Sequence, residues 1–351
     1  MFKKKKETPL GTIRVKARNL RAYEKTKFGW KKVKKEFLEL KLVVKLFKAQ
    51  KQFKILIDTK NPVFLKGQLS SEGQEQGARI NILPNGNKLE KAYSLFSPHL
   101  RIHDQDSHDH WDVLYQNKGG TWSYVYTLEK RKQHRNKKYK KVVEFEKYYN
   151  KLVNNVKKGL LNKEDFMSVP MYTLLNTYMR IGNEIYYKAH KHKGLSTLKK
   201  KDINVKGQTV SFNYIGKDGV AISIEKKFTA TYIKRLNTLL KSVKRNDFVF
   251  AKNGHPLHEP DFKSAFVKYC GKEFYPHIVR SHHATMIVKK FLAGKRKLKR
   301  EEVNILYLSL AHDLGHKKFN KKKQQWQENY AVTVNSYIQP ELVEKIEKRI
   351  V

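Results

Sequence analysis

The chain has 351 residues, with 75 Lys and Arg against 32 Asp and Glu, so its formal net charge is +43. A surplus of this size favours a polyanionic partner, and aromatic residues interleaved with the basic ones favour a folded nucleic-acid binder over a disordered basic arm. The single cysteine, Cys270, excludes a disulfide framework and a Cys-rich zinc site, and it reads as a small apolar residue in a helix.

No stretch is apolar enough over sufficient length to predict a membrane span, and the N-terminus lacks the apolar run of a secretory signal. We therefore expect a protein with no membrane partner that stays inside a cell or virus, with DNA in the cytoplasm or nucleoid.

Residues 1–75 are predicted to form a basic N-terminal extension whose role the sequence does not give. Residues 12–17 have the pattern of a short strand, and the apolar residues between Lys34 and Phe53 indicate a helix. A turn-rich stretch at 70–77 predicts a boundary. Because the segment is strongly basic, we expect it to add contacts to DNA.

Residues 76–135 are predicted to form a β-rich N-terminal domain. Alternating residues predict strands at 78–83, 111–115 and 121–126, with turns at 84–87 and 118–120. Within this domain, the stretch from His103 to Asp112 is rich in residue types that bind metals, and His108, His110 and Asp112 share one strand face. We predict no metal site, and interpret the cluster as a polar strand edge near DNA, with a divalent metal as the alternative.

Residues 136–351 are predicted to form a mainly helical domain with one small sheet, which makes the fold class α+β. A basic helix is expected over 130–162, and a second helix begins at 168–170 and carries Arg180 on its way to Ile185. Alternation then predicts a three-stranded β-meander over 203–224 with Lys217 at its second turn. Further helices are expected near 229–242, 260–270, 280–293, 300–313 and 340–350, with a short exposed basic linker at about 317–331.

The residue types in this domain suit phosphoryl transfer on DNA. Cutting and rejoining a strand without an energy source needs a nucleophile that stores the bond energy as a covalent ester. It also needs cations on the non-bridging oxygens and an acid for the leaving sugar oxygen. Arginine suits the clamp, a lysine on a hairpin suits the acid, and a tyrosine near the end of the chain suits the nucleophile.

These motifs resemble the type IB DNA topoisomerases in their compact bacterial and viral form, which share a superfamily with the tyrosine recombinases. The likeness is densest in MRIGNE (179–184), in the segment 193–220 that begins KGLSTL, and in VNSYIQPELV (334–343). It is thinner in RSHHAT (280–285) and LGHKK (314–318). It covers roughly residues 80–351.

The resemblance implies a role for each candidate residue. Arg180 and Arg280 would clamp the scissile phosphate, Lys217 would protonate the 5′ oxygen, and His316 would donate a hydrogen bond to a phosphate oxygen. Tyr337 would attack phosphorus and form a 3′-phosphotyrosyl link. Tyr124 and Tyr126 would touch the DNA backbone, although packing on a sheet is an equal alternative. Neither a metal nor ATP is needed.

Two departures from the family pattern leave alternatives open. The gap between His316 and Tyr337 is longer than in compact members and contains Tyr330, a competing nucleophile, but NSYIQP favours Tyr337. His277 precedes Arg280 with the HxxR spacing of tyrosine recombinases, where the topoisomerases usually carry a lysine, and it could replace that lysine at the phosphate. For His282 and His283, we expect one to be buried and one to lie near the phosphate.

The leading hypothesis is a monomeric type IB topoisomerase, an isomerase that closes around duplex DNA and relaxes supercoils. A tyrosine recombinase or integrase is the first alternative. The HxxR spacing of His277 and Arg280 favours it, whereas the RIGNE motif at 180–184 and the β-meander favour a topoisomerase. The second alternative is a non-catalytic DNA-binding or packaging protein. The presence of all five candidate catalytic residues opposes this last reading.

Overall fold

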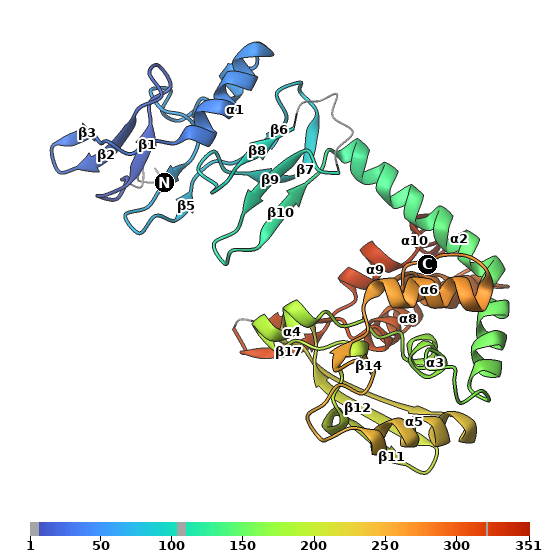
Figure 1. The fold of residues 1–351 in the computed structure, drawn as a ribbon. Helices are drawn as coiled ribbons and strands as arrows, with labels where there is room; N and C mark the ends of the chain where they lie inside the picture. Colours follow the sequence, from blue (N-terminus) through green and yellow to red (C-terminus); the bar gives the residue numbers. More distant parts are fainter. Residues whose placement is uncertain (1–6, 104–109, 321) are drawn as a thin grey trace. The chain divides into compact units, whose positions relative to one another are not determined.

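The computed structural model describes residues 7–103, 110–320 and 322–351, and the chain divides into two compact units, residues 1–137 and 138–351 (Figure 1). Helices and antiparallel sheets together confirm the predicted α+β class. The predicted boundary near residue 75 falls inside the first unit, and the one near residue 136 lies close to the border between the units. Among the described residues, no helix combines the length and the apolar character that crossing a membrane requires.

The first unit contains a five-stranded antiparallel sheet formed by residues of the predicted N-terminal extension. Its strand order is β3-β2-β1-β4-β5, with β1 at Ile13–Val15, β2 at Ala22–Thr26, β3 at Gly29–Lys32, β4 at Gln68–Leu69 and β5 at Glu75–Gln76. Helix α1 (Leu38–Ala49) and the 3-10 helix η1 (Phe53–Leu56) follow β3 in the chain. The extension is therefore a folded element with a sheet of its own, of which the sequence predicted one strand and the helix.

The remainder of this unit holds two smaller sheets. One pairs β6 (Ile80–Ile82) with β7 (Lys88–Tyr93), and the other has the order β10-β9-β8, with β8 at Arg101–Ile102, β9 at Val113–Gln116 and β10 at Trp122–Val125. The three strands predicted here are confirmed with small shifts at their ends. Val15, Phe47, Tyr93 and Val125 belong to one buried cluster, so the five-stranded sheet and the smaller sheets share a core.

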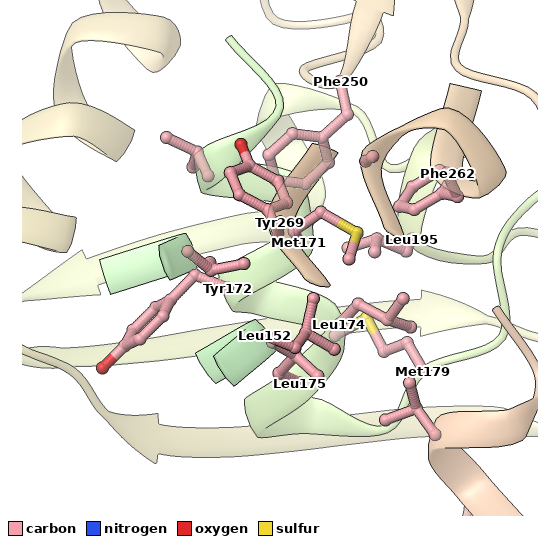
Figure 2. Close-up of a cluster of buried hydrophobic side chains, with 14 of the residues drawn as sticks. Leu152, Met171, Tyr172, Leu174, Leu175, Met179, Leu195, Phe250, Phe262 and Tyr269 are labelled. Carbon is pink, nitrogen blue, oxygen red and sulfur yellow. The ribbon is translucent and has the colours of Figure 1, made fainter. Parts of the chain in front are cut away.

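The second unit is mainly helical. Helix α2 (Leu128–Gly159) begins in the first unit and continues into the second, where its apolar stripe is buried at Val142, Phe145, Leu152 and Val156. Figure 2 shows part of the core, in which Leu152 lies among side chains of later helices. These helices are α3 (Ser168–Thr177), α4 (Glu184–His190), α5 (Ala230–Ser242), α6 (Glu259–Cys270) and α7 (Ile278–Leu292). Cys270, which was predicted as a small apolar residue in a helix, is the last residue of α6 and is buried.

The predicted β-meander is present. Its strands are β11 (Ile203–Lys206), β12 (Thr209–Ile215) and β13 (Ala221–Lys227), in the order β11-β12-β13, and the turn η4 (Lys217–Gly219) joins the last two. The 3-10 helices η2 (Leu195–Thr197) and η3 (Lys200–Asp202) precede it, and a small hairpin of β14 (Ala251–Lys252) and β15 (His255–Pro256) follows α5.

The C-terminal helices form a second core in this unit. They are α8 (Arg300–Asp313), α9 (Ala331–Tyr337) and α10 (Pro340–Glu347), and they bury a separate apolar cluster with α7. The segment predicted as a short exposed basic linker contains a hairpin of β16 (Lys317–Asn320) and β17 (Gln325–Glu328). The rings of the cross-strand pair Phe319 and Trp326 have centroids 5.3 Å apart, a contact that stabilises this pairing.

The structure corrects the predicted place of Arg180, which does not lie on a helix. Helix α3 ends at Thr177, because Tyr178 adopts a left-handed conformation with φ of 54°, and α4 begins only after Asn183. The helical spacing of Tyr178, Ile181 and Ile185 is therefore coincidental. Contacts of this loop to a distant segment, described below, override the local period.

Candidate active site

Arg180 lies in the loop 178–183, which is fixed by the segment 194–197. The amide of Leu195 donates to the carbonyl oxygen of Arg180 at 2.8 Å. A Cβ at Gly194 would lie 2.5 Å from that carbonyl oxygen, and one at Gly182 would lie 2.2 Å from Oγ1 of Thr197. Only glycine allows so close an approach of the two segments. The RIGNE and GLSTL motifs are therefore two halves of one contact, which holds the backbone of Arg180.

Tyr337 is the last residue of α9, and the other candidate side chains surround it. Its hydroxyl accepts a hydrogen bond of 2.9 Å from Nη2 of Arg180. The rings of His316 and His277 have centroids 4.8 Å and 5.2 Å from its ring, and the guanidinium carbon of Arg280 lies 5.1 Å from the same centroid. The structure thus brings together Arg180, Arg280, His316 and Tyr337, and places His277 beside them.

Arg280 is buried on α7, with 2% of its surface exposed. Its Nη1 donates to the carbonyl oxygen of Tyr178, and its Nη2 donates to the carbonyl oxygen of Leu314 at 2.7 Å and to Nε2 of His316 at 3.1 Å. Its Nε is buried and has no partner among the described residues. Burial lowers the pKa of this guanidinium, which nevertheless stays charged at neutral pH.

The hydrogen bonds of His316 define its tautomer. Burial, followed by the charges of Arg280 and Arg180, lowers its pKa to about 3, so the ring is neutral at neutral pH. Nε2 accepts from Arg280, and the proton is therefore on Nδ1, which lies 2.7 Å from Oγ1 of Thr333 and donates to it. The predicted donor of a hydrogen bond to phosphate is thus an acceptor at Nε2 in the free protein.

His277 precedes α7 and is also neutral. Burial first, and then the charges of Arg280, Arg180 and Lys138, lower its pKa to about 2. It lines a cavity together with Arg180 and Lys217. The residue that departs from the family pattern therefore lies in the same site as the matching residues.

Lys217 lies at the η4 turn, exposed, where Asp218 has a left-handed φ of 62°. It lines a cavity of about 260 Å³ together with Arg180, Arg280 and His316. Among the described residues, none forms a hydrogen bond or ion pair with its ammonium group. The predicted acid is thus a cation at the rim of the cavity whose protons are available to a ligand.

Several residues around the site were not predicted. The Nζ of Lys138 lies 5.1 Å from the ring centroid of Tyr337, and the Oγ1 of Thr333 holds His316. Lys138 is one of many lysines in a basic helix, so its spacing carried no signal. Thr333 lies four residues before Tyr337, so a helix over 331–337 places it on the side of the nucleophile. Seven residues give too short a pattern to predict that helix.

The two histidines after Arg280 take different partners. His282 is buried against Phe145 and Tyr149 and bonds Glu146. His283 stacks on Tyr178, with ring centroids 3.6 Å apart, and its Nε2 lies 2.9 Å from Oδ2 of Asp313. His283 therefore supports the residue whose carbonyl oxygen accepts from Arg280.

Tyr330, the competing nucleophile, faces α8. Its hydroxyl donates to Oδ1 of Asn304 at 3.2 Å, and its ring lies 5.4 Å from that of Tyr307. In the described part of the chain, no arginine contacts its hydroxyl. The structure therefore places Tyr337, and not Tyr330, among the arginines.

Tyr124 and Tyr126 belong to the first unit. Tyr124 is 45% exposed on β10, and the hydroxyl of Tyr126 lies 3.0 Å from Nε2 of His110. Asp112 accepts from the amide of Thr127 at 2.7 Å and from Nζ of Lys130 at 2.6 Å, so two members of the predicted polar cluster serve the local structure.

For the metal alternative in the His103–Asp112 stretch, residues 104–109, which include His108, lie outside the described residues. Within the ranges that the structure describes, no group of three His, Cys, Asp or Glu side chains is arranged to hold a metal ion.

Comparison with known proteins finds one family whose model matches more than half of this chain. A family model described as the catalytic core of eukaryotic DNA topoisomerase I matches residues 128–345. No curated protein matches the chain. Among solved structures, the XerH site-specific recombinase bound to difH substrate, in its pre-cleavage complex, is similar at a TM-score of 0.33 and 16% identity, over 57% of this chain and 53% of that chain.

A second XerH structure, the post-cleavage complex with a palindromic difH substrate, has a TM-score of 0.34 and 19% identity, over 50% of this chain and 48% of the recombinase. The chain thus matches about half the length of each recombinase.

Proposed function

The chain belongs to the family of the eukaryotic DNA topoisomerase I catalytic core. From this premise we propose that it is a type IB topoisomerase, which relaxes supercoiled duplex DNA. It would cut one strand through a 3′-phosphotyrosyl intermediate, let the duplex rotate, and rejoin the strand without ATP or a metal. The observation that carries the proposal is the buried Tyr337 hydroxyl bonded to Arg180 and surrounded by Arg280, His316 and His277.

Tyr337 is proposed as the nucleophile. Its oxygen forms a bond to phosphorus while the bond from phosphorus to the 5′ oxygen breaks, so a phosphodiester is exchanged for a phosphodiester and its energy is kept. The hydrogen bond from Arg180 stabilises negative charge as the phenol gives up its proton to solvent. Rejoining is the same exchange in reverse, with the 5′ hydroxyl as nucleophile.

Arg180 and Arg280 are proposed to hold the non-bridging oxygens. The unpartnered Nε of Arg280 is a buried donor that a phosphate oxygen would satisfy. A phosphate dianion-like transition state would also favour protonation of His316, because an adjacent negative charge raises the pKa that burial and the arginines now lower. Nε2 of His316 would then become a donor to phosphate.

Lys217 is proposed as the general acid for the leaving 5′ oxygen. Its ammonium group is exposed and without a partner among the described residues, at the rim of the cavity that Arg180, Arg280 and His316 line. Proton transfer to the leaving oxygen removes the cost of expelling an alkoxide, an effect worth typically about 10²- to 10⁴-fold in rate. The first unit, with Tyr124 and Tyr126, is proposed to contact the duplex backbone, and the protein is proposed to act as a monomer.

Relaxation of supercoiled plasmid in EDTA without ATP tests this function. We expect the native chain to relax the plasmid, Tyr337→Phe to be inactive because no covalent ester can form, and Tyr330→Phe to retain activity as the matched control. If Tyr337→Phe still relaxes the plasmid, Tyr337 is not the nucleophile. Binding without relaxation by the native chain would reject the topoisomerase function and leave a non-catalytic DNA-binding protein.

A tyrosine recombinase is the second candidate, and the position of His277 favours it. The HxxR pair His277 and Arg280 is typical of that class, and both side chains lie against Tyr337. Recombination requires defined DNA sites and a tetrameric synapse. Tyr337-dependent relaxation of plasmids that share no sequence, by a protein that sediments as a monomer with DNA, would exclude it.

A further inference from the structure

The hairpin of β2 and β3 carries an unusually exposed aromatic side chain. Thr26 pairs with Gly29, so Lys27 and Phe28 form a two-residue tip, and the side chain of Phe28 is 101% exposed. The tip has a defined backbone, because the hydroxyl of Thr26 donates to the carbonyl oxygen of Gly29 at 2.9 Å and accepts from the amide of Phe28 at 3.3 Å. The phenylalanine ring contributes nothing to the core.

The base of the hairpin is anchored. The ring of Trp30 packs on that of Phe64, which is 2% exposed, with centroids 4.6 Å apart. The Nζ of Lys16 lies 4.0 Å from the ring centroid of Tyr23. These contacts hold the two strands against the rest of the sheet, and the tip extends from a fixed support.

The charge around the tip is strongly positive. Between Arg21 and Lys32 the sequence has five basic residues and one acidic residue, Glu24. Lys27, Lys31 and Lys32 are exposed. Within the described ranges of the chain, no carboxylate pairs with any of these three lysines. The lysines therefore suit a polyanionic partner, and the exposed Phe28 ring suits a partner that also offers an apolar surface for it to insert into.

We propose that this hairpin, residues 21–32, is a second DNA contact, in which the lysines bind backbone phosphates and Phe28 inserts between base pairs as a wedge. The proposal rests on the proposed function only for duplex DNA as the partner. A second copy of this chain would bring the same positive charge and be repelled, whereas duplex DNA offers phosphates beside stacked apolar bases. Apolar wedges of this kind unstack a base step and bend the duplex.

Equilibrium binding of a fluorescent duplex tests the proposal, with every variant made in the full chain carrying Tyr337→Phe so that no strand is cut. Stacking of one base on an aromatic ring implies that Phe28→Ala weakens binding about 5- to 100-fold without changing its salt dependence. Lys27→Gln with Lys31→Gln should instead lower the slope of log K against log salt by about 2. Phe28→Trp should retain affinity.

Val63→Ala is the matched control, since Val63 is 55% exposed in the same unit but lies outside the hairpin, and it should not change affinity. In parallel, 2-aminopurine placed at successive positions of the duplex reports unstacking. With Phe28 present, we expect the fluorescence of 2-aminopurine to increase at one base step. With Phe28→Ala, we expect no increase at any step. If the chains with Phe28 and with Phe28→Ala bind the duplex equally tightly and give equal 2-aminopurine fluorescence, Phe28 does not insert between base pairs.

The outcome is independent of the proposed function. Relaxation by the chain with Tyr337 intact is measured separately, so loss of the wedge with retained relaxation rejects only the hairpin proposal. A wedge signal from a chain that never relaxes plasmid would reject only the topoisomerase activity.

Discussion

At the scale of single residues, the candidate site is already assembled in the free protein. The hydroxyl of Tyr337 already bonds Arg180, and Arg280 is already buried beneath its ring. Donors fixed in advance cost no reorganisation when charge develops on phosphate, which is why preorganised groups stabilise a transition state well. Two arginines and two neutral histidines lie close together in this site. Protonating either histidine in acid would add a further positive charge beside the arginines, so we expect acid to destabilise the site.

His316 should make the folded state less stable in acid. Its folded pKa of about 3 lies below the ordinary value of 6.5, so between these values the unfolded chain binds a proton that the folded chain does not. Stability from the neutral ring is fully present above pH 6.5 and is lost as the pH falls through this window. By pH 5.5 the loss is roughly 1.4 kcal/mol relative to pH 7.5.

Urea unfolding of the native chain and of His316→Gln at pH 7.5, 6.5 and 5.5 measures this effect. The glutamine variant keeps a polar side chain but cannot titrate, so its unfolding free energy should fall by roughly 1.4 kcal/mol less over this range than that of the native chain. The comparison cancels the other groups that titrate in both chains. Parallel pH profiles for the two proteins would show that His316 does not carry the effect.

At the scale of elements, the end of α3 connects the two arginines. The left-handed Tyr178 stops the helix, starts the loop that presents Arg180, and accepts from Arg280. His283 on α7 stacks on this tyrosine and bonds Asp313 at the end of α8. Helices α3, α7 and α8 therefore meet around Tyr178. We expect His283, which holds this residue, to act as a positioning residue.

Replacing His283 should slow the reaction without weakening DNA binding. His283→Ala removes both the stacking and the hydrogen bond, and misplacing the arginines by a fraction of an ångström should lower the rate of single-turnover cleavage about tenfold or more. His283→Phe keeps the stacking and should recover part of the rate. His282→Phe is the matched control on the same helix, because His282 contacts α2 and should affect only stability. A changed DNA affinity with an unchanged cleavage rate would contradict the positioning role.

The elements that sequence predicted well are those with local signals. The meander alternates cleanly, and its two turns carry Gly207 and Gly219 with positive φ, so Lys217 could be placed at a turn before the structure was known. The position of Arg180 was predicted wrongly, because a contact between residues 180–182 and 194–197 decides its backbone. Helix α9 was not predicted either, since seven residues give too short a pattern to detect.

At the scale of the whole molecule, the described part of the predicted extension, residues 7–75, contributes to the first unit's core and is not an appendage. Val44 and Phe47 of α1 and Val15 of β1 are buried in the same cluster as Tyr93 and Val125. Sequence could not predict this, because strands of two to five residues pair across long separations and their register is set by partners elsewhere in the chain. Deleting the segment would expose the shared core, so its contribution to DNA binding is better measured by substitution.

The net charge of +43 predicts a steep dependence of DNA binding on salt. A protein that neutralises about 6 to 10 phosphates releases as many counterions, and its affinity falls about 10³- to 10⁵-fold between 50 and 200 mM salt. We expect the full chain carrying Tyr337→Phe to fall in this range on a duplex of about three helical turns.

Fluorescence anisotropy at five salt concentrations gives the slope, and the variant Lys27→Gln with Lys31→Gln gives the share that comes from these two hairpin lysines. A duplex of unrelated sequence serves as the control and should give the same slope, because phosphate contacts carry no sequence information. A loss of less than about tenfold over this range would mean that most of the positive charge faces away from the DNA. The surplus charge would then need another polyanionic partner to explain it.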